Sequence, residues 1–147
     1  QPEAYPMSAA AVTPNVKGIV VCDEVFGSDV EVNVFDLERV RQEMIAPSFP
    51  CVRTFYLFLQ LESGRAGTFN GNLRINHDAT GREVRRVQLT ATFEEDRGGY
   101  QGRVFLIQDC LFLRRGRYNI EAWFWDHEGR EVQKGHRAFD LIEEESS

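Results

Sequence analysis

Side chains that could carry out catalysis are scattered through this sequence rather than gathered into motifs. None of the serines expected in loops lies in the Gly-x-Ser-x-Gly turn that exposes a nucleophile. The histidines stand alone or beside carboxylates, without the HxH or HExxH spacing that places two zinc ligands on one element. We therefore predict no catalytic residue, no metal site and no cofactor. The residues considered are Ser28, Ser48, Ser63, His77, His127 and His136.

Carboxylates are the other candidates for chemistry. Asp23, Asp36 and Asp109 each stand among apolar residues, and we expect them to be half-buried. Asp109 is the most unusual, because it interrupts a segment that is apolar on both faces. A buried carboxylate needs a partner, so we expect an arginine from a neighbouring strand or backbone N–H groups at a bulge. The acidic stretch at 94–96 could supply oxygen ligands to calcium, but solvated loop charges explain it more simply.

Four aromatic residues are the best candidates for binding. Trp123 and Trp125 point to the same side of one predicted strand, away from the predicted core, and lie about 6.7 Å apart along it. Two neighbouring indoles can stack on a sugar ring, a peptide or another subunit. If a bulge changes the alternation, or if another element covers them, they belong to the core instead. Tyr56 and Phe58 stand on the second face of a strand whose first face is already apolar.

The totals fit one water-soluble domain: 147 residues, of which 42% are hydrophobic. A net charge of −6 disfavours binding to nucleic acid or to an anionic membrane surface. No apolar stretch approaches the length of about 18 residues that a membrane span needs. Residues 1–14 lack the basic start and the long apolar core of an intact signal peptide. We therefore expect no nucleic acid partner, no membrane and a cytoplasmic location.

The cysteines are three in number and widely spaced, at Cys22, Cys51 and Cys110, and no two form a CxxC pair. Each lies in or beside an apolar, strand-like segment, where a thiol behaves as a small buried hydrophobe. We expect buried thiols, and one disulfide between two of them is the alternative.

Short apolar segments separated by turn residues at intervals of roughly 8 to 15 residues are typical of an all-β sandwich or barrel. We predict a Greek-key-like β-sandwich of about eight mostly antiparallel strands in residues 17–142, with one short helix. Residues 1–16 are expected to form a mobile N-terminal arm, and residues 143–147 an acidic, serine-containing tail. The predicted strands are 17–26, 30–36, 52–62, 68–76, 83–93, 102–113, 117–125 and 131–141.

Alternation within the strands predicts the core. The segments 52–62 and 102–113 are apolar on both faces and therefore need a second cover. A short helix that begins at Asp36, with Leu37, Val40 and Met44 on one side, is expected to provide part of that cover. Apolar side chains that it leaves exposed would mark an interface with another chain. The predicted core residues are Phe69, Leu73, Ile75, Val87, Leu89, Ala91, Phe93, Tyr118, Ile120, Ala122 and Phe124.

Two similar stretches, DATGREV at 78–84 and DHEGREV at 126–132, each place a glycine a few residues after an aspartate. This is good chemistry for a tight turn, so both stretches predict β-hairpins. A duplicated functional loop is the alternative.

A set of short motifs resembles a bacterial family of small uncharacterised β-sandwich proteins. In that family a strand ending in Cys-Asp leads to a Gly-Val-Phe-Asp-like strand, and a Phe-Pro pair precedes a long aromatic strand. Asn33 stands here where that family's glycine is expected. The resemblance covers most of 18–141 and implies a compact β-sandwich without an assigned activity, so it supplies no catalytic residue. The matching residues are Cys22, Asp23, Phe35, Asp36, Phe49 and Pro50.

Our leading hypothesis is a non-catalytic interaction or accessory module that binds another protein or a copy of itself through strand-face aromatics or a sheet edge. The alternative is a carbohydrate-binding module that uses Trp123 and Trp125 as an open platform. The third is a hydrolytic enzyme with a loop-built acidic site, which requires Asp109, Asp23 or the histidine-bearing turns to converge in one pocket.

Overall fold

The computed structural model of the protein describes residues 13–27, 35–41, 43–63, 65–94 and 99–144. Within these ranges every regular element is a β-strand, nine in all, as the period-two patterns predicted. The strands are β1 (Asn15–Gly27), β2 (Phe35–Arg41), β3 (Glu43–Ala46), β4 (Cys51–Ser63), β5 (Gly67–His77), β6 (Glu83–Phe93), β7 (Gly99–Phe112), β8 (Gly116–Trp125) and β9 (Glu131–Glu143).

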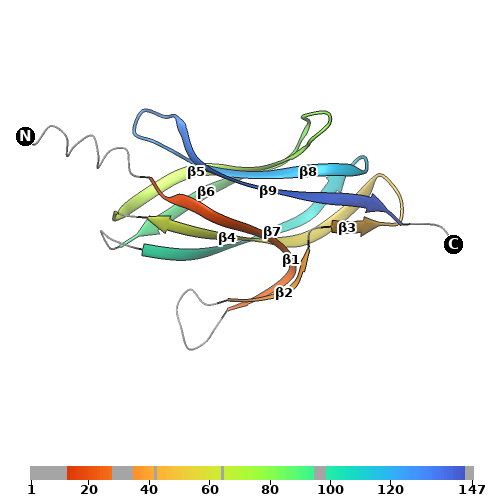
Figure 1. The fold of residues 1–147 in the computed structure, drawn as a ribbon, viewed down its shortest axis with the longest axis horizontal. Helices are drawn as coiled ribbons and strands as arrows, with labels where there is room; N and C mark the ends of the chain where they lie inside the picture. The colour runs from red at the N-terminus through yellow and green to blue at the C-terminus, as the bar shows by residue number, and fades with distance from the viewer. Residues whose placement is uncertain (1–12, 28–34, 42, 64, 95–98, 145–147) are drawn as a thin grey trace, which may run out of the picture.

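The strands form two sheets that lie one over the other (Figure 1). The four-stranded sheet has the order β2-β1-β4-β7, and the five-stranded sheet has the order β3-β9-β8-β5-β6. All neighbouring strands are antiparallel except β3 and β9, which run parallel. The all-β, mostly antiparallel prediction is therefore confirmed.

The hydrophobic core contains apolar side chains from both sheets. The predicted core residues of β5, β6 and β8 are buried, except that Phe69 and Val87 are half-buried and pack against the others. Inward side chains of β4 supply the part of the core that belongs to the four-stranded sheet. Full burial of one such side chain contributes about 1.5–3 kcal/mol, so the core is the main source of stability. The β4 core residues are Phe55, Leu57, Leu59 and Leu61.

The predicted short helix is wrong, because strands β2 and β3 occupy its place. In β2, Asp36 pairs with Phe26 of β1. In β3, Met44 and Ala46 are buried while Glu43 and Ile45 are exposed, which is strand alternation. A helix of about nine residues cannot hold its shape alone in water. Pairing of β2 with β1 and of β3 with β9 provides hydrogen-bond partners for the backbone N–H and C=O groups of these residues instead.

The predicted ends of the chain fall largely outside the described residues, which exclude 1–12 and 145–147. Thr13, the first described residue, is buried, and β1 begins at Asn15 rather than at 17. Most of the predicted strand at 30–36 also lies outside the described residues. In the described part of the chain, no helix has the length and apolar character needed to cross a bilayer.

Both predicted hairpins are confirmed. Residues 78–82 connect β5 to β6, and residues 126–130 connect β8 to β9. Gly81 and Gly129 have φ angles of 70° and 80°, which favour glycine because it has no side chain to clash. The carboxylate of Asp126 accepts hydrogen bonds from the backbone N–H groups of Glu128 and Arg130, which fixes the second turn.

We expect Gly71→Ala to reduce the free energy of unfolding by about 3 kcal/mol or more. A Cβ atom at Gly71 would lie 1.8 Å from the backbone oxygen of Trp123 on β8, and the sheet cannot yield there without losing its pairing. Urea unfolding followed by circular dichroism measures the change. The matched control is Gly18→Ala, where the nearest atom is 3.7 Å away and the loss should stay below about 1 kcal/mol. Equal losses in the two variants would contradict the packing of β5 on β8.

Candidate functional site

The outer face of the four-stranded sheet carries a run of apolar side chains. On β4 and β7, Tyr56 pairs with Leu106 and Phe58 pairs with Val104, so these side chains stand together on the face that turns away from the core. The patch exists because the inner face of β4 is already filled by core residues. We call it the outer-face patch; it consists of Val20, Val52, Tyr56, Phe58, Val104, Leu106 and Leu111.

Three members of the outer-face patch are about half exposed: Val52 at 55%, Leu111 at 50% and Leu106 at 48%. Tyr56 and Phe58 are half-buried, so the structure places these two predicted binding residues on the patch. Soluble monomers rarely expose large contiguous apolar patches, whereas interfaces use them. The second face of the strands predicted to be apolar on both faces is therefore partly open, most of all at Val52, Leu106 and Leu111.

Polar residues surround the outer-face patch, and one charged residue, the exposed Asp109, interrupts it on β7 between Leu106 and Leu111. Thr54 and Gln108 are the uncharged polar residues between its two ends. The charged pair of Lys17 and Glu62, with Nζ and Oε1 3.5 Å apart, lies toward the Ser63 end of β4. Depletion of charge at the centre and polar residues at the rim are typical of protein interfaces.

The structure buries Trp123 completely, so the prediction of an open platform is wrong for this residue. Its ring lies under two guanidinium groups, with the Cζ atom of Arg74 5.1 Å and that of Arg86 5.8 Å from the ring centroid. Trp125 meets it edge-on, at an interplanar angle of 89° and a centroid distance of 6.1 Å. Two perpendicular rings, one of them covered, do not form a flat stacking surface.

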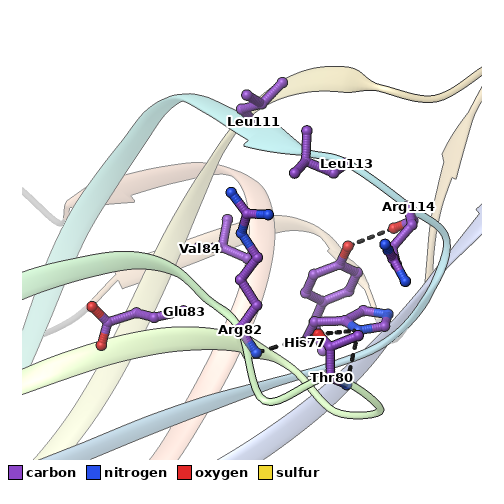
Figure 2. Close-up of a pocket in the computed structure, with 9 residues that line it drawn as sticks. His77, Thr80, Arg82, Glu83, Val84, Leu111, Leu113 and Arg114 are labelled. Carbon is purple, nitrogen blue, oxygen red and sulfur yellow. Dashed lines mark hydrogen bonds between the residues drawn. The ribbon is translucent and has the colours of Figure 1, made fainter.

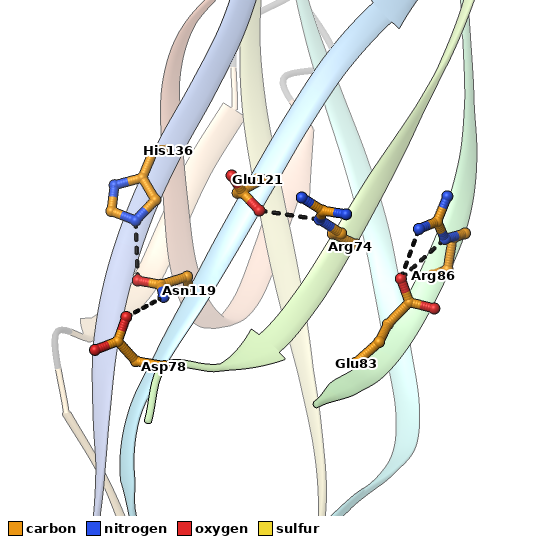
Figure 3. Close-up of polar contacts among 7 residues, drawn as sticks. All are labelled: Arg74, Asp78, Glu83, Arg86, Asn119, Glu121 and His136. Carbon is orange, nitrogen blue, oxygen red and sulfur yellow. Dashed lines mark hydrogen bonds and ion pairs between the residues drawn. The ribbon is translucent and has the colours of Figure 1, made fainter. Parts of the chain in front are cut away.

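The outer face of the five-stranded sheet is polar and internally paired (Figure 3). The guanidinium of Arg74 donates to Glu121 at 2.9 Å, and that of Arg86 donates to Glu83 at 2.7 Å. Beside them, Asn119 links two further side chains: its amide donates to Asp78, and its oxygen lies 2.9 Å from His136 Nε2. The polar side chains of this face are thus bonded to one another.

Trp125 is half-buried and lines a wide hollow of about 590 Å³ together with Phe69, Asp126 and His127. Hydrogen bonds from the backbone N–H and the guanidinium of Arg130, and from the N–H of Glu128, hold the pKa of the Asp126 carboxyl below its usual value. The Asp126 carboxylate therefore stabilises the β8–β9 turn through these hydrogen bonds, and we do not count it among ligand-binding groups.

Among the acidic candidates, the structure describes the side chain of Asp109. The prediction that Asp109 is half-buried is wrong: it is exposed, at a bulge in β7 where its φ angle is 52°. Its backbone N–H donates to Thr54 Oγ1 at 3.0 Å. Asp23 and Asp36 lie in β1 and β2, but their side chains are outside the described part of the structure. In the part of the chain that is described, no three His, Cys, Asp or Glu side chains could hold a metal ion together.

The two histidine-bearing turns lie at opposite ends of the five-stranded sheet. Strands β5 and β8 are antiparallel, and His77 at the end of β5 pairs with Tyr118 near the start of β8. His127 follows the other end of β8 and is exposed. The convergence that a loop-built site would need is therefore missing between these two residues.

His77 is a buried, fully bonded histidine (Figure 2). Its Nδ1 accepts a hydrogen bond from the backbone N–H of Thr80 at 3.3 Å and lies 2.9 Å from the Thr80 hydroxyl. Its Nε2 lies 3.2 Å from the carbonyl oxygen of Arg115, which can only accept, so Nε2 carries the proton. Both ring nitrogens thus serve to hold two turns together.

Two of the three predicted buried thiols are confirmed. Cys22 and Cys110 are buried, Cys51 is half-buried, and all three are thiols rather than disulfides. Burial raises the pKa of Cys110 to about 11 and also raises that of Cys51. Because the thiolate is the reactive form, neither of these two residues is suited to act as a nucleophile.

Sequence reasoning selected Tyr56 and Phe58 but did not include the three most exposed members of the patch in the site. The available signal was the two-faced apolarity of 102–113, which already contained Leu106 and Leu111. Val52 gave a weaker signal, because it stands at the edge of its segment. Only the register, in which Val52 pairs with Leu111, shows that they continue the same surface.

Comparison with known proteins finds no matching protein family and no similar curated protein. Among solved structures, the chain is similar to a β-glucosidase from Erythrobacter marinus (11% identity, TM-score 0.49, 89% of this chain and 16% of that one). It is also similar to a β-glucosidase from Listeria innocua (6% identity, TM-score 0.49, 90% and 16%). A CARDB domain from Pyrococcus furiosus shows 9% identity and a TM-score of 0.43, over 88% of this chain and 97% of that one.

The chain thus spans only 16% of the length of each β-glucosidase chain. At TM-scores below 0.5, these likenesses carry no argument about what this protein binds or does.

The two tryptophans should differ in their access to a quencher. In Trp125→Phe the remaining indole is the buried Trp123, so acrylamide should quench its fluorescence several-fold less than that of Trp123→Phe, in which Trp125 remains. Stern–Volmer constants measure the difference. Equal, strong quenching in the two variants would show that the arginines do not cover Trp123.

Replacing Asp126 by Asn should destabilise the protein in a pH-dependent way. The pKa of Asp126 is lower in the folded state, so its charged form adds stability above the unfolded-state pKa of about 3.9, and this is lost as the pH falls through the folded-state value. The difference in unfolding free energy between wild type and Asp126→Asn should therefore shrink from pH 7 to about pH 2. Urea titrations at each pH measure it, and a constant difference would contradict the assignment.

Proposed function

We propose that the protein is a non-catalytic interaction module that binds protein through the outer-face patch, in the first place a second copy of itself. The observation that carries this proposal is the half-exposed state of Val52, Leu106 and Leu111 on one face of the sheet. Association would remove these side chains from water, and each square ångström of apolar surface so buried contributes about 25 cal/mol.

The shape and chemistry of the patch support a face-to-face contact. It is built on β4 and β7, whose backbones are held by a long antiparallel ladder, so little order has to be gained on binding. The aromatic rings of Tyr56 and Phe58 are of the type enriched at interface centres. A twofold axis through the uncharged part of the patch, around Tyr56, Phe58 and Leu106, would place the same surface on both partners.

Two other functions have less support. A carbohydrate-binding platform needs open, coplanar rings, whereas Trp123 is buried and stands perpendicular to Trp125. A hydrolytic site needs converging acids, whereas Asp109 is exposed at a bulge and His77 is bonded at both ring nitrogens. We therefore place the paired tryptophans second and the enzyme third.

We further propose a Greek-key-like connectivity, kinship with the small bacterial β-sandwich family, and a cytoplasmic location. The connectivity is supported by the chain's repeated passage between sheets, at β4 to β5, β6 to β7 and β7 to β8. Three cysteines without a disulfide fit a reducing compartment. Peptide mapping of alkylated protein from its native cells would test the thiol state.

The proposal predicts concentration-dependent association that a charge in the patch abolishes. Sedimentation velocity over roughly 1 to 500 μM, the range in which weak dimers form, should show a dimer for wild type and a monomer for Leu106→Glu. The control is Ile45→Glu, which puts the same charge at an equally exposed apolar residue on β3 and should leave the dimer intact. A strict monomer for wild type, or equal dissociation of both variants, would contradict self-association through this face.

A further inference from the structure

A second site, which adjoins the outer-face patch at Leu111, lies where the β5–β6 turn meets the β7–β8 connection (Figure 2). A pocket of about 290 Å³ opens there, at the lower end of the sizes that hold small molecules. Its apolar wall consists of Val84 from β6, Leu111 from the end of β7, Leu113 just after that strand, and Tyr118 from β8. The pocket thus joins the edges of the two sheets at one end of the molecule.

The frame of this pocket is rigid. The ring of His77 is bonded to both turns, through Thr80 on one side and the carbonyl of Arg115 on the other. Tyr118 packs against His77 at a centroid distance of 4.9 Å, and its hydroxyl donates to the carbonyl oxygen of Arg114. A Cβ at Gly116 would lie 2.9 Å from His77 Nε2, so this close approach depends on glycine. A pocket held in this way loses little entropy when it binds a ligand.

The polar groups of the pocket are mainly cationic. Arg82 and Arg114 line it, and neither guanidinium forms an ion pair with any residue in the described ranges. The carboxylate among the lining residues is Glu83, which accepts two hydrogen bonds from Arg86 and points away from the pocket (Figure 2). On a chain of net charge −6, this pocket therefore offers local positive charge beside an apolar wall.

We propose that this pocket binds a small apolar carboxylate. Its ring or branched chain would pack on Val84, Leu113 and Tyr118, and its carboxylate would meet Arg82 and Arg114. Guanidinium groups match carboxylates in charge and in hydrogen-bonding geometry. His77 takes no part in chemistry on the ligand, because both its nitrogens are already used. The proposal adds a small-molecule site to the protein interface; Leu111 is the residue that borders both.

Phenylacetate is the probe, because it combines one aromatic ring with one carboxylate and fits a pocket of this size. Chemical shifts of the ¹⁵N-labelled full chain should move saturably in residues 77–84 and 111–118. Phenylacetamide, which has the same shape without the charge, should bind about tenfold more weakly, and phenethylamine, a cation, should not bind measurably.

Arg82→Gln and Arg114→Gln should each weaken phenylacetate binding about tenfold while leaving phenylacetamide binding unchanged. The matched control is Lys17→Gln, which also removes one positive charge. Lys17 lies near residues 61 and 62 of β4, whereas the pocket lies near the other end of that strand, where Val52 pairs with Leu111. Leu113→Glu, at an exposed residue, places a carboxylate beside the pocket and should abolish phenylacetate binding.

Equal binding of the acid, the amide and the amine would overturn the proposal, as would shifts outside the two segments or arginine variants that bind like wild type. The absence of saturable shifts in the Leu106→Glu protein with both arginines intact, at 10 mM probe, would overturn it too; 10 mM is a generous limit for a ligand of this size. The titration is carried out in the Leu106→Glu background. Because this variant is expected to be a monomer, the chemical shifts then report on ligand binding and not on dimer formation. The ligand-binding proposal and the self-association proposal can therefore fail independently.

Discussion

The structure depends on one constraint. Strands β4 and β7 are apolar on both faces, but the core between two sheets can bury only one face of each strand. The inward side chains of β4 fill the core together with the inner face of the five-stranded sheet; they are Phe55, Leu57, Leu59 and Leu61. The outward side chains of the same strands, Tyr56 and Leu106 among them, then have no second layer among the described residues that buries them fully. This surplus of outward apolar side chains is the feature on which our proposal of an interaction surface rests.

The core faces could be predicted because strand alternation is local, and Leu73, Ile75 and Ile120 lie where their parity puts them. The helix at 36–44 could not be excluded from sequence, because its apolar spacing suited a helix while its partners, β1 and β9, are distant in the chain. A bulge at Asp109 was one of two expectations, but the exposure of its side chain could not be predicted, because the sequence does not show to which side a bulge turns a residue.

Within the candidate site, the outward position of Tyr56 and Phe58 could be predicted from the alternation of side chains along one strand, which requires no knowledge of the neighbouring strands. The burial of Trp123 did not, because the covering groups come from Arg74 and Arg86 on two other strands and depend on register. The arginine-lined pocket was not predicted, since its walls come from strands and turns that only the packing of the two sheets brings together.

The central claim is that the outer-face patch is a surface for association, and the methyl groups of its exposed residues report on it directly. The decisive measurement is relaxation of ¹³C-methyl signals by a soluble paramagnetic agent in dilute and in concentrated protein. The account predicts that the methyl groups of Val52, Leu106 and Leu111 are accessible when dilute and shielded when concentrated, while those of Ile45 stay accessible at both concentrations. Shielding that is already complete in dilute protein, or access that never changes, would contradict it.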